Sequence, residues 1–184
     1  MKITYKNIKL VAVRGDIANQ PDVDAVVNAA NAELKIGGGV AAAIHRTAGP
    51  ELYEASKHLA PLSPGQAVIT GAFNLPNDHV IHCLGPVFGK DKPEEEFLAN
   101  CYKNALKLAE ENQISSIAFP AISTGAFNYP FKEATQIAFQ TITAAVENLK
   151  YIEKIKFVLN GEDDLKLYTE YLQDLSSEAS HSNL

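Results

Sequence analysis

Short apolar runs alternate with helix-like segments along this chain, and that alternation restricts its fold more than any other feature. The opening "MKITYKNIKLVAVRGDI" reads as a short strand, a turn at Lys6-Asn7 and a longer strand that ends near Arg14. Five further runs bounded by Gly, Pro, Asn or Asp read as buried strands: "DAVVNAAN", "GQAVITGA", "HVIHCLG", "SSIAFPAIS" and "IKFVLN". Helical patterns cover residues 40–48, 50–58, 94–111, 132–149 and 163–175. This order predicts an α/β fold in which helices cover both faces of a mostly parallel sheet.

Length and composition set the expected domain organisation. A chain of 184 residues with 46% hydrophobic side chains is long enough to bury one core and short for two. We therefore expect a single domain over residues 1–175. The last stretch, 176–184, is polar and of low complexity, and we expect a disordered tail there.

Charge and cysteine content argue against several classes of protein. The net charge is −6 and no Lys or Arg cluster occurs, so nonspecific nucleic-acid binding is not expected. No apolar stretch approaches the roughly 20 residues needed to span a bilayer. Cys83 and Cys101 lack CxxC spacing, and no apolar run follows Met1, so we expect a cytoplasmic protein. The oligomeric state is not readable from the sequence, and a monomer is the default expectation.

Four segments that follow predicted strands carry the residues suited to ligand binding. In open α/β sheets, ligands bind beyond the carboxyl ends of the strands. The segments at these ends are "RGDI" (14–17), "NAANAELKIGGG" (28–39), "LGPVFG" (84–89) and "AISTGAFNYP" (121–130). We expect them to meet at one edge of the sheet.

The second of these segments has the composition of an anion-binding loop. Gly37, Gly38 and Gly39 lack Cβ atoms where the chain enters a helix near Val40, so backbone N–H groups can approach a ligand closely. A helix N-terminus offers free donors and partial positive charge. A second N–H-rich loop is expected at residues 123–126, and two facing loops suit a diphosphate. The alternative for three glycines alone is a tight turn without a ligand.

Six motifs in fixed order resemble those of the macrodomain family, most closely its bacterial MacroD-like branch. They are "GDI", "VVNAANAEL", "GGGVAAAIHRTAGP", "PGQAVIT", "VIHCLGP" and "SIAFPAISTGAFNYP". The resemblance spans roughly residues 8–172. It implies a three-layer α/β/α fold with a mixed, mostly parallel sheet. It also implies a cleft for ADP-ribose, or for ADP-ribosylated protein, with no metal or organic cofactor.

The resemblance also implies roles for single residues. Asp16 would accept a hydrogen bond from the adenine amino group, and Ile17 would add a backbone contact beside it. The alternative for Asp16 is a turn or helix N-cap. Asn31 would hold hydroxyls of the distal ribose, whereas Asn28 is better suited to pinning the loop backbone.

The two loops would enclose the rest of the ligand. By the same resemblance, Gly38, Gly39 and Val40 would line the distal ribose and the phosphates, with Gly37 beside them. The segment that would wrap the diphosphate consists of Ser123, Thr124, Gly125, Ala126 and Phe127. Phe127 would also lie against the distal ribose, so Asn31 and Phe127 are the candidates for fixing that sugar during a reaction.

The chain departs from the branch pattern at two positions. Where the branch has "GGGGVDGAIH", with an aspartate proposed to position or activate water, this chain has Ala41. Residues 41 and 45 share a helix face, so His45 remains beside the lost carboxylate, either as a catalytic-loop contact or as a structural partner of a strand. Where the family commonly stacks an aromatic residue on adenine, this chain has Asn160, whose alternative is a plain strand-to-helix turn.

These residues leave three functional hypotheses. The first is hydrolysis of ADP-ribosyl esters, either on acidic side chains or in O-acetyl-ADP-ribose. The second is a noncatalytic ADP-ribose reader, which Ala41 and Asn160 favour. The third is a phosphatase that acts on ADP-ribose 1″-phosphate. A metal site at His79, His82 and Cys83 is disfavoured because strand alternation sends 82 to the opposite face from 79 and 83.

Overall fold

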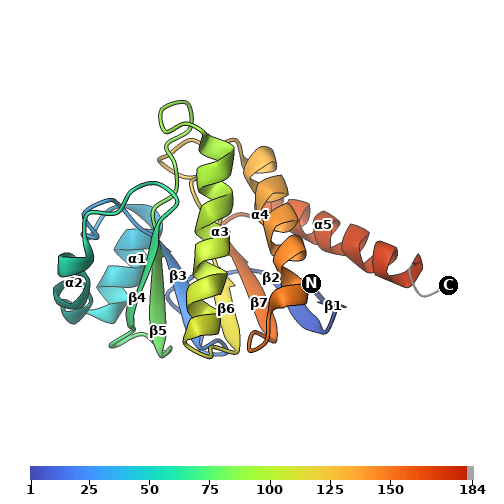
Figure 1. Cartoon of the computed structure of the whole chain (residues 1–184), viewed down its shortest axis with the longest axis horizontal. Helices are drawn as coiled ribbons and strands as arrows, with labels where there is room; N and C mark the ends of the chain where they lie inside the picture. The colour runs from blue at the N-terminus through green and yellow to red at the C-terminus, as the bar shows by residue number, and fades with distance from the viewer. Residues whose placement is uncertain (182–184) are drawn as a thin grey trace.

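One mixed sheet of seven strands is the centre of the computed structural model, which describes residues 1–181 (Figure 1). Its order is β1-β2-β7-β6-β3-β5-β4. The five central strands run parallel, while β1 and β4 pair antiparallel at the two edges. The mixed, mostly parallel sheet expected from the sequence is confirmed. The strands are β1 (Lys2–Tyr5), β2 (Ile8–Arg14), β3 (Ala25–Ala29), β4 (Ala67–Gly71), β5 (His79–Cys83), β6 (Ser116–Phe119) and β7 (Lys154–Leu159).

Helices cover both faces of the sheet, as Figure 1 shows for α3 and α4 in front of the strands. Apolar residues of α1 and α2 pack on one face, and those of α3, α4 and α5 pack on the other. Each predicted helical segment is present, and α2 and α4 finish in 3-10 turns at residues 57–59 and 146–148. The helices are α1 (Gly39–Ala48), α2 (Glu51–Ser56), α3 (Glu94–Glu111), α4 (Phe131–Ala145) and α5 (Glu162–His181).

The larger core is aromatic where α4 and α5 meet the sheet. Phe139 lies 5.1 Å from Phe157 and 5.3 Å from Tyr168, measured between ring centroids. On the α3 side, Tyr102 lies 5.2 Å from Phe119. Packed aromatic pairs add roughly 0.5–1.5 kcal/mol beyond their burial. These contacts hold β6 and β7, the strands beside the predicted site, in place.

Helix α5 differs from the sequence-based expectation at its carboxyl end. Residues 176–181 continue the helix, although their polar composition predicted disorder, and residues 182–184 lie outside the described residues. Extending an existing helix costs little compared with nucleating one. Within this turn, Ser177 and Ser180 donate to the carbonyls of Gln173 and Ser176. Figure 1 shows the carboxyl-terminal part of α5 projecting beyond the sheet.

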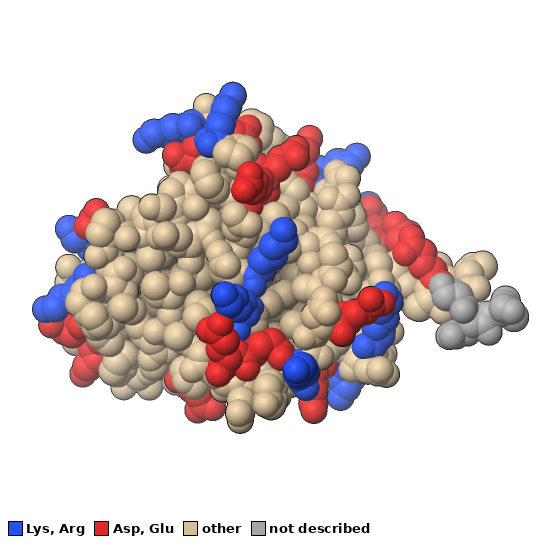
Figure 2. Space-filling model, in the orientation of Figure 1, with Lys and Arg blue, Asp and Glu red and all other residues tan. Residues whose placement is uncertain are grey.

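The surface over α3 and α4 carries charges of both signs. Figure 2 shows Lys and Arg side chains beside Asp and Glu on this face rather than in a continuous basic strip. Within residues 1–181, no helix is both long enough and apolar enough to cross a membrane.

A buried chain of polar side chains crosses strands β3, β5 and β4. Asn28 donates through Nδ2 to Nδ1 of His82 at 3.1 Å, and His82 Nε2 lies 2.9 Å from the Thr70 hydroxyl. Because Thr70 donates to the Gly71 carbonyl, His82 must carry its proton on Nε2 and is neutral. Burial, helped by the nearby charge of His45, lowers the pKa of His82 to about 3. Both ring nitrogens are engaged, so His82 has no lone pair left for a metal.

We expect His82 to make the protein sensitive to acid. The unfolded chain takes up a proton near pH 6.5 but the folded chain does not, so stability falls as the pH drops from 6.5 toward 3. The free energy of unfolding should decrease by about 2 kcal/mol between pH 7 and pH 5 from this residue alone. Urea unfolding at several pH values gives the free energy of unfolding as a function of pH. This dependence should be shallower for His82→Gln than for His58→Gln, a change at an exposed histidine. An equal pH dependence in the two variants would contradict the neutral, buried state of His82.

Candidate functional site

The segments predicted to bind a ligand lie at one edge of the sheet, where the five central parallel strands end. Residue 16 follows β2 and residue 160 follows β7, while residues 121–127 follow β6, residues 30–39 follow β3 and residue 85 follows β5. Neighbouring strands lie about 4.8 Å apart, so the edge from β2 to β3 extends over roughly 14 Å. The site is therefore elongated across several strands.

A cavity of about 240 Å³ opens at the β6, β3 and β5 part of this edge. Most of the predicted residues of the two loops line it, together with Ala41 and Gly85. The predicted residues that it contains are Asn31, Gly37, Gly38, Gly39, Val40, Ser123, Gly125, Ala126 and Phe127. It also contains Ala29, Ala30, Ala121 and Ile122, which belong to the predicted segments but were not singled out, because apolar side chains carry no chemical signal.

Helix α1 begins at the wall of the cavity with its backbone donors uncapped. Gly38 occupies the N-cap position in an extended conformation, and no side chain accepts from the first turn. That turn contains no acidic residue either. Gly39 has a φ of 53°, a conformation that glycine adopts without strain. The free N–H groups and the helix dipole therefore make this wall favourable for an anion.

Asn31 is held rigidly by the backbone of its own loop. Its Nδ2 donates to the Lys35 carbonyl at 2.8 Å, and its Oδ1 accepts from the Lys35 N–H at 2.9 Å. The amide keeps one N–H and one lone pair for a ligand in the cavity. A Cβ at Gly37 would lie 3.0 Å from Nδ2, so this glycine leaves room for the amide.

The loop-pinning role expected for Asn28 is thus filled by Asn31. Asn28 is fully buried, and its side chain contacts His82 rather than the loop. Side-chain alternation on β3 sends Asn28 into the interior, whereas Asn31 comes after the strand has ended. Asn31 still lines the cavity, so its position agrees with the prediction.

Ser123 supplies the polar group of the opposite wall. Its φ of 66° is unusual for a residue with a side chain, and its hydroxyl is buried without a protein partner. Strain of this kind is found where a residue's position serves a site. Thr124 does not line the cavity, because its hydroxyl donates to the Ala121 carbonyl at 2.8 Å and supports the loop instead.

Besides Thr124, four further predicted residues lie outside the cavity. Asp16 is exposed and its Oδ1 accepts from the Ala18 N–H at 2.9 Å, which is the turn geometry left open above. The Ile17 side chain belongs to the core under α1. Asn160 is exposed at the end of β7, and its carbonyl accepts from Arg14 at 3.2 Å. His45 is buried with both ring nitrogens unpartnered, and burial lowers its pKa.

Within residues 1–181, the side chains that line this cavity include no ionisable group. Its polar groups are backbone N–H donors, the Asn31 amide and the Ser123 hydroxyl. Such a site can bind a negatively charged ligand through neutral donors. It contains no carboxylate or imidazole that could take up a proton from water.

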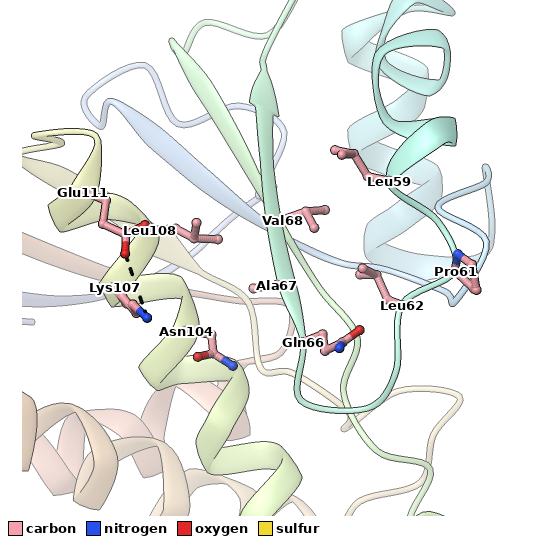
Figure 3. Close-up of a pocket in the computed structure, with 10 residues that line it drawn as sticks. All are labelled: Leu59, Pro61, Leu62, Gln66, Ala67, Val68, Asn104, Lys107, Leu108 and Glu111. Carbon is pink, nitrogen blue, oxygen red and sulfur yellow. Dashed lines mark ion pairs between the residues drawn. The ribbon is translucent and has the colours of Figure 1, made fainter.

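A separate groove of about 380 Å³ lies beside the edge strand β4 (Figure 3). Figure 3 shows β4 between α3 on one side and the segment that carries Leu59 and Leu62 on the other. Its charged groups, Lys107 and Glu111, pair with each other at 4.0 Å. No residue of the four predicted segments lines this groove, whereas three of those segments line the first cavity, which is therefore the candidate site.

The family model of the Macro domain matches residues 27–138. This chain belongs to the macrodomain family. The matched range of this macrodomain contains both cavity loops and helix α1.

Similar proteins include both enzymes and ligand complexes. An O-acetyl-ADP-ribose deacetylase of Klebsiella pneumoniae is 47% identical over 165 residues, which are 87% of this macrodomain and 94% of that protein. A mutant macrodomain of Oceanobacillus iheyensis with ADPR is 41% identical, with a TM-score of 0.89 over 95% of this chain and 97% of that one. A Trypanosoma brucei macrodomain in complex with ADP-ribose is 34% identical, with a TM-score of 0.83 over 89% and 68% of the two chains.

Two glycines of the cavity should respond differently to alanine. A Cβ at Gly85 would lie 2.1 Å from the Ser123 hydroxyl and 2.8 Å from the buried Ile122 side chain, whereas a Cβ at Gly38 meets no atom within 4 Å. Gly85→Ala should lower the free energy of unfolding by about 2 kcal/mol through overpacking. Gly38→Ala should change it by less than about 0.5 kcal/mol. Urea titrations measure the free energy of unfolding of both variants. Equal effects would show that the loop around Gly85 moves to accept a Cβ without cost, contrary to the prediction.

Proposed function

We propose that this macrodomain binds ADP-ribose and hydrolyses esters on its distal ribose. The substrates are O-acetyl-ADP-ribose and mono-ADP-ribosylated acidic side chains. The observation that carries this proposal is the uncharged cavity between the uncapped start of α1 and the Ser123 loop, at one end of an elongated strand edge. The deacetylase name of the Klebsiella pneumoniae relative supports the same reaction class.

The ligand would extend across the strand ends. The adenine lies near Asp16 and Asn160 at β2 and β7, and the distal ribose lies near Asn31 and Phe127 at β3 and β6. The diphosphate then faces the N-terminus of α1 and the 123–126 loop. The roughly 14 Å between β2 and β3 suits an extended dinucleotide-like molecule rather than a single phosphate.

Hydrolysis must proceed without a protein base in the cavity. Water adds to the ester carbonyl, the bond between the acyl carbon and the ribose oxygen breaks, and that oxygen takes up a proton. A phosphate of the substrate and the backbone of the glycine loop hold the water, while Asn31 and Phe127 fix the ribose. Side-chain general acid–base help is typically worth about 10²- to 10⁴-fold, so turnover is slow but not absent.

A noncatalytic reader is the second candidate, and the absence of an ionisable side chain among the described residues of the cavity favours it. His45 does not replace the carboxylate, because it lies on the buried side of α1 and outside the cavity. The two functions share one binding site and differ only in turnover.

We also propose a cytoplasmic, reducing location. Cys83 and Cys101 are both free, and each thiol is buried with a carbonyl as its hydrogen-bond partner. Burial raises the pKa of Cys101 to about 12, so this thiol stays protonated. Neither cysteine forms a disulfide bond.

Binding can be tested at Gly38. Gly38→Glu should weaken ADP-ribose binding by at least a hundredfold, because a carboxylate would fill the cradle and repel the diphosphate. Gly38→Gln has nearly the same volume without the charge and should retain more affinity. Isothermal titration calorimetry with ADP-ribose measures both, and an unchanged affinity for Gly38→Glu would contradict the site assignment.

Catalysis can be tested at Ala41, which lines the cavity. Ala41→Asp should increase hydrolysis of O-acetyl-ADP-ribose by roughly 10- to 100-fold, because it adds a carboxylate near the distal ribose. Ala41→Asn has the same shape without a base and should not gain rate. The measurement is a time course of ADP-ribose release, with a glutamate-linked substrate in parallel. Binding without release by the wild type would make this chain a reader.

A further inference from the structure

Three apolar side chains, exposed or partly exposed, belong to the cavity or to the segments that adjoin it. They are Ile36, Phe88 and Phe127, which we call the apolar lip. Ile36 is 65% exposed and directly precedes the cavity residue Gly37, and Phe88 is 41% exposed. Phe127 lines the cavity itself. Exposed apolar groups that gather beside a cavity are typical of ligand contacts.

The three residues follow neighbouring strands at the same edge of the sheet. Ile36 follows β3, Phe88 follows β5 and Phe127 follows β6, and β3 pairs with both β5 and β6. Asp16 and Asn160 lie at the other end of the same edge, after β2 and β7. A ligand with its adenine at β2 and β7 therefore directs the substituent of its distal ribose toward the apolar lip.

Phe88 is held in place although much of its ring is exposed. Its N–H donates to the Phe127 carbonyl at 2.9 Å, and its ring lies 4.9 Å from the Tyr129 ring. The Asp91 carboxylate accepts from the Val87 N–H at 2.8 Å and closes the loop around it. A fixed, exposed ring loses little entropy when it contacts a ligand.

We propose that the apolar lip is a subsite for the aliphatic chain of acyl esters of ADP-ribose, so that this macrodomain prefers acyl groups longer than acetyl. The inference rests on the proposed ester hydrolysis and names the substrate class within it. The three side chains of the lip are themselves uncharged, with Lys35 directly before Ile36 and Lys90 two residues after Phe88. An aliphatic chain of four to six carbons extends past the distal ribose and covers Ile36 and Phe88.

The subsite is tested with ADP-ribose analogues that carry C2, C4 or C6 acyl groups through a hydrolysis-resistant amide. Calorimetry should show affinity rising roughly tenfold from C2 to C6, about twofold for each partly buried methylene. Ile36→Asn should reduce that gain to threefold or less. Phe73→Asn is the matched control, because Phe73 is also an exposed apolar residue but follows β4 at the opposite end of the sheet, and it should keep the full gain.

The corresponding esters give the kinetic readout. For the wild type, kcat/KM should rise with acyl length, and Ile36→Asn should flatten this dependence without losing the C2 substrate. An affinity independent of chain length would overturn the subsite while leaving the proposed function intact. Faster release from an ADP-ribosylated acidic peptide than from any acyl ester would also overturn it, in favour of a peptide partner recognised by Lys35 and Lys90. If the wild-type protein did not bind unmodified ADP-ribose at all, the proposed function itself would be contradicted.

Discussion

The parallel pairing of β3 between β6 and β5 is the constraint on which the site depends. Parallel neighbours end at the same edge, so the glycine loop after β3, the Ser123 loop after β6 and Gly85 after β5 converge there. The polar chain of Asn28, His82 and Thr70 joins β3, β5 and β4 in the interior just below this edge. Helix α1 starts after the loop that follows β3, and its free N–H groups lie at the wall of the cavity.

The cavity is lined by uncharged hydrogen-bond donors, and the apolar lip beside it offers no donors from its side chains. Backbone N–H groups, an amide and a hydroxyl favour an anionic ligand, while the absence of an ionisable side chain among the described lining residues leaves chemistry to positioning and to the substrate's own phosphate. The apolar lip lies where the distal substituent would leave the cavity. In the proposed function, affinity would depend on the helix start, rate on the Ala41 position and substrate choice on the lip, which are different parts of one edge.

Much of this arrangement could be predicted from local sequence, but the roles of individual polar residues could not. Glycines before a small-residue helix predicted the anion-binding loop. Asn28 and Asn31 are three residues apart and chemically identical, yet one is buried against His82 and the other holds Lys35. Asp16 and His45 were likewise recognisable as polar candidates, but only packing decides that Asp16 closes a turn and that His45, on α1 itself, is buried.

The sequence by itself determined the order of strands and helices, the positions of the loops and the family, because periodicity, glycines and strand-end polar residues act over a few neighbouring positions. The tertiary structure decided which side chains face the cavity, the pairing of Phe88 with Phe127, and the helical state of residues 176–181. These outcomes depend on strand register and packing between residues far apart in the chain. Such contacts leave no local pattern, so they exist only once the sheet has formed.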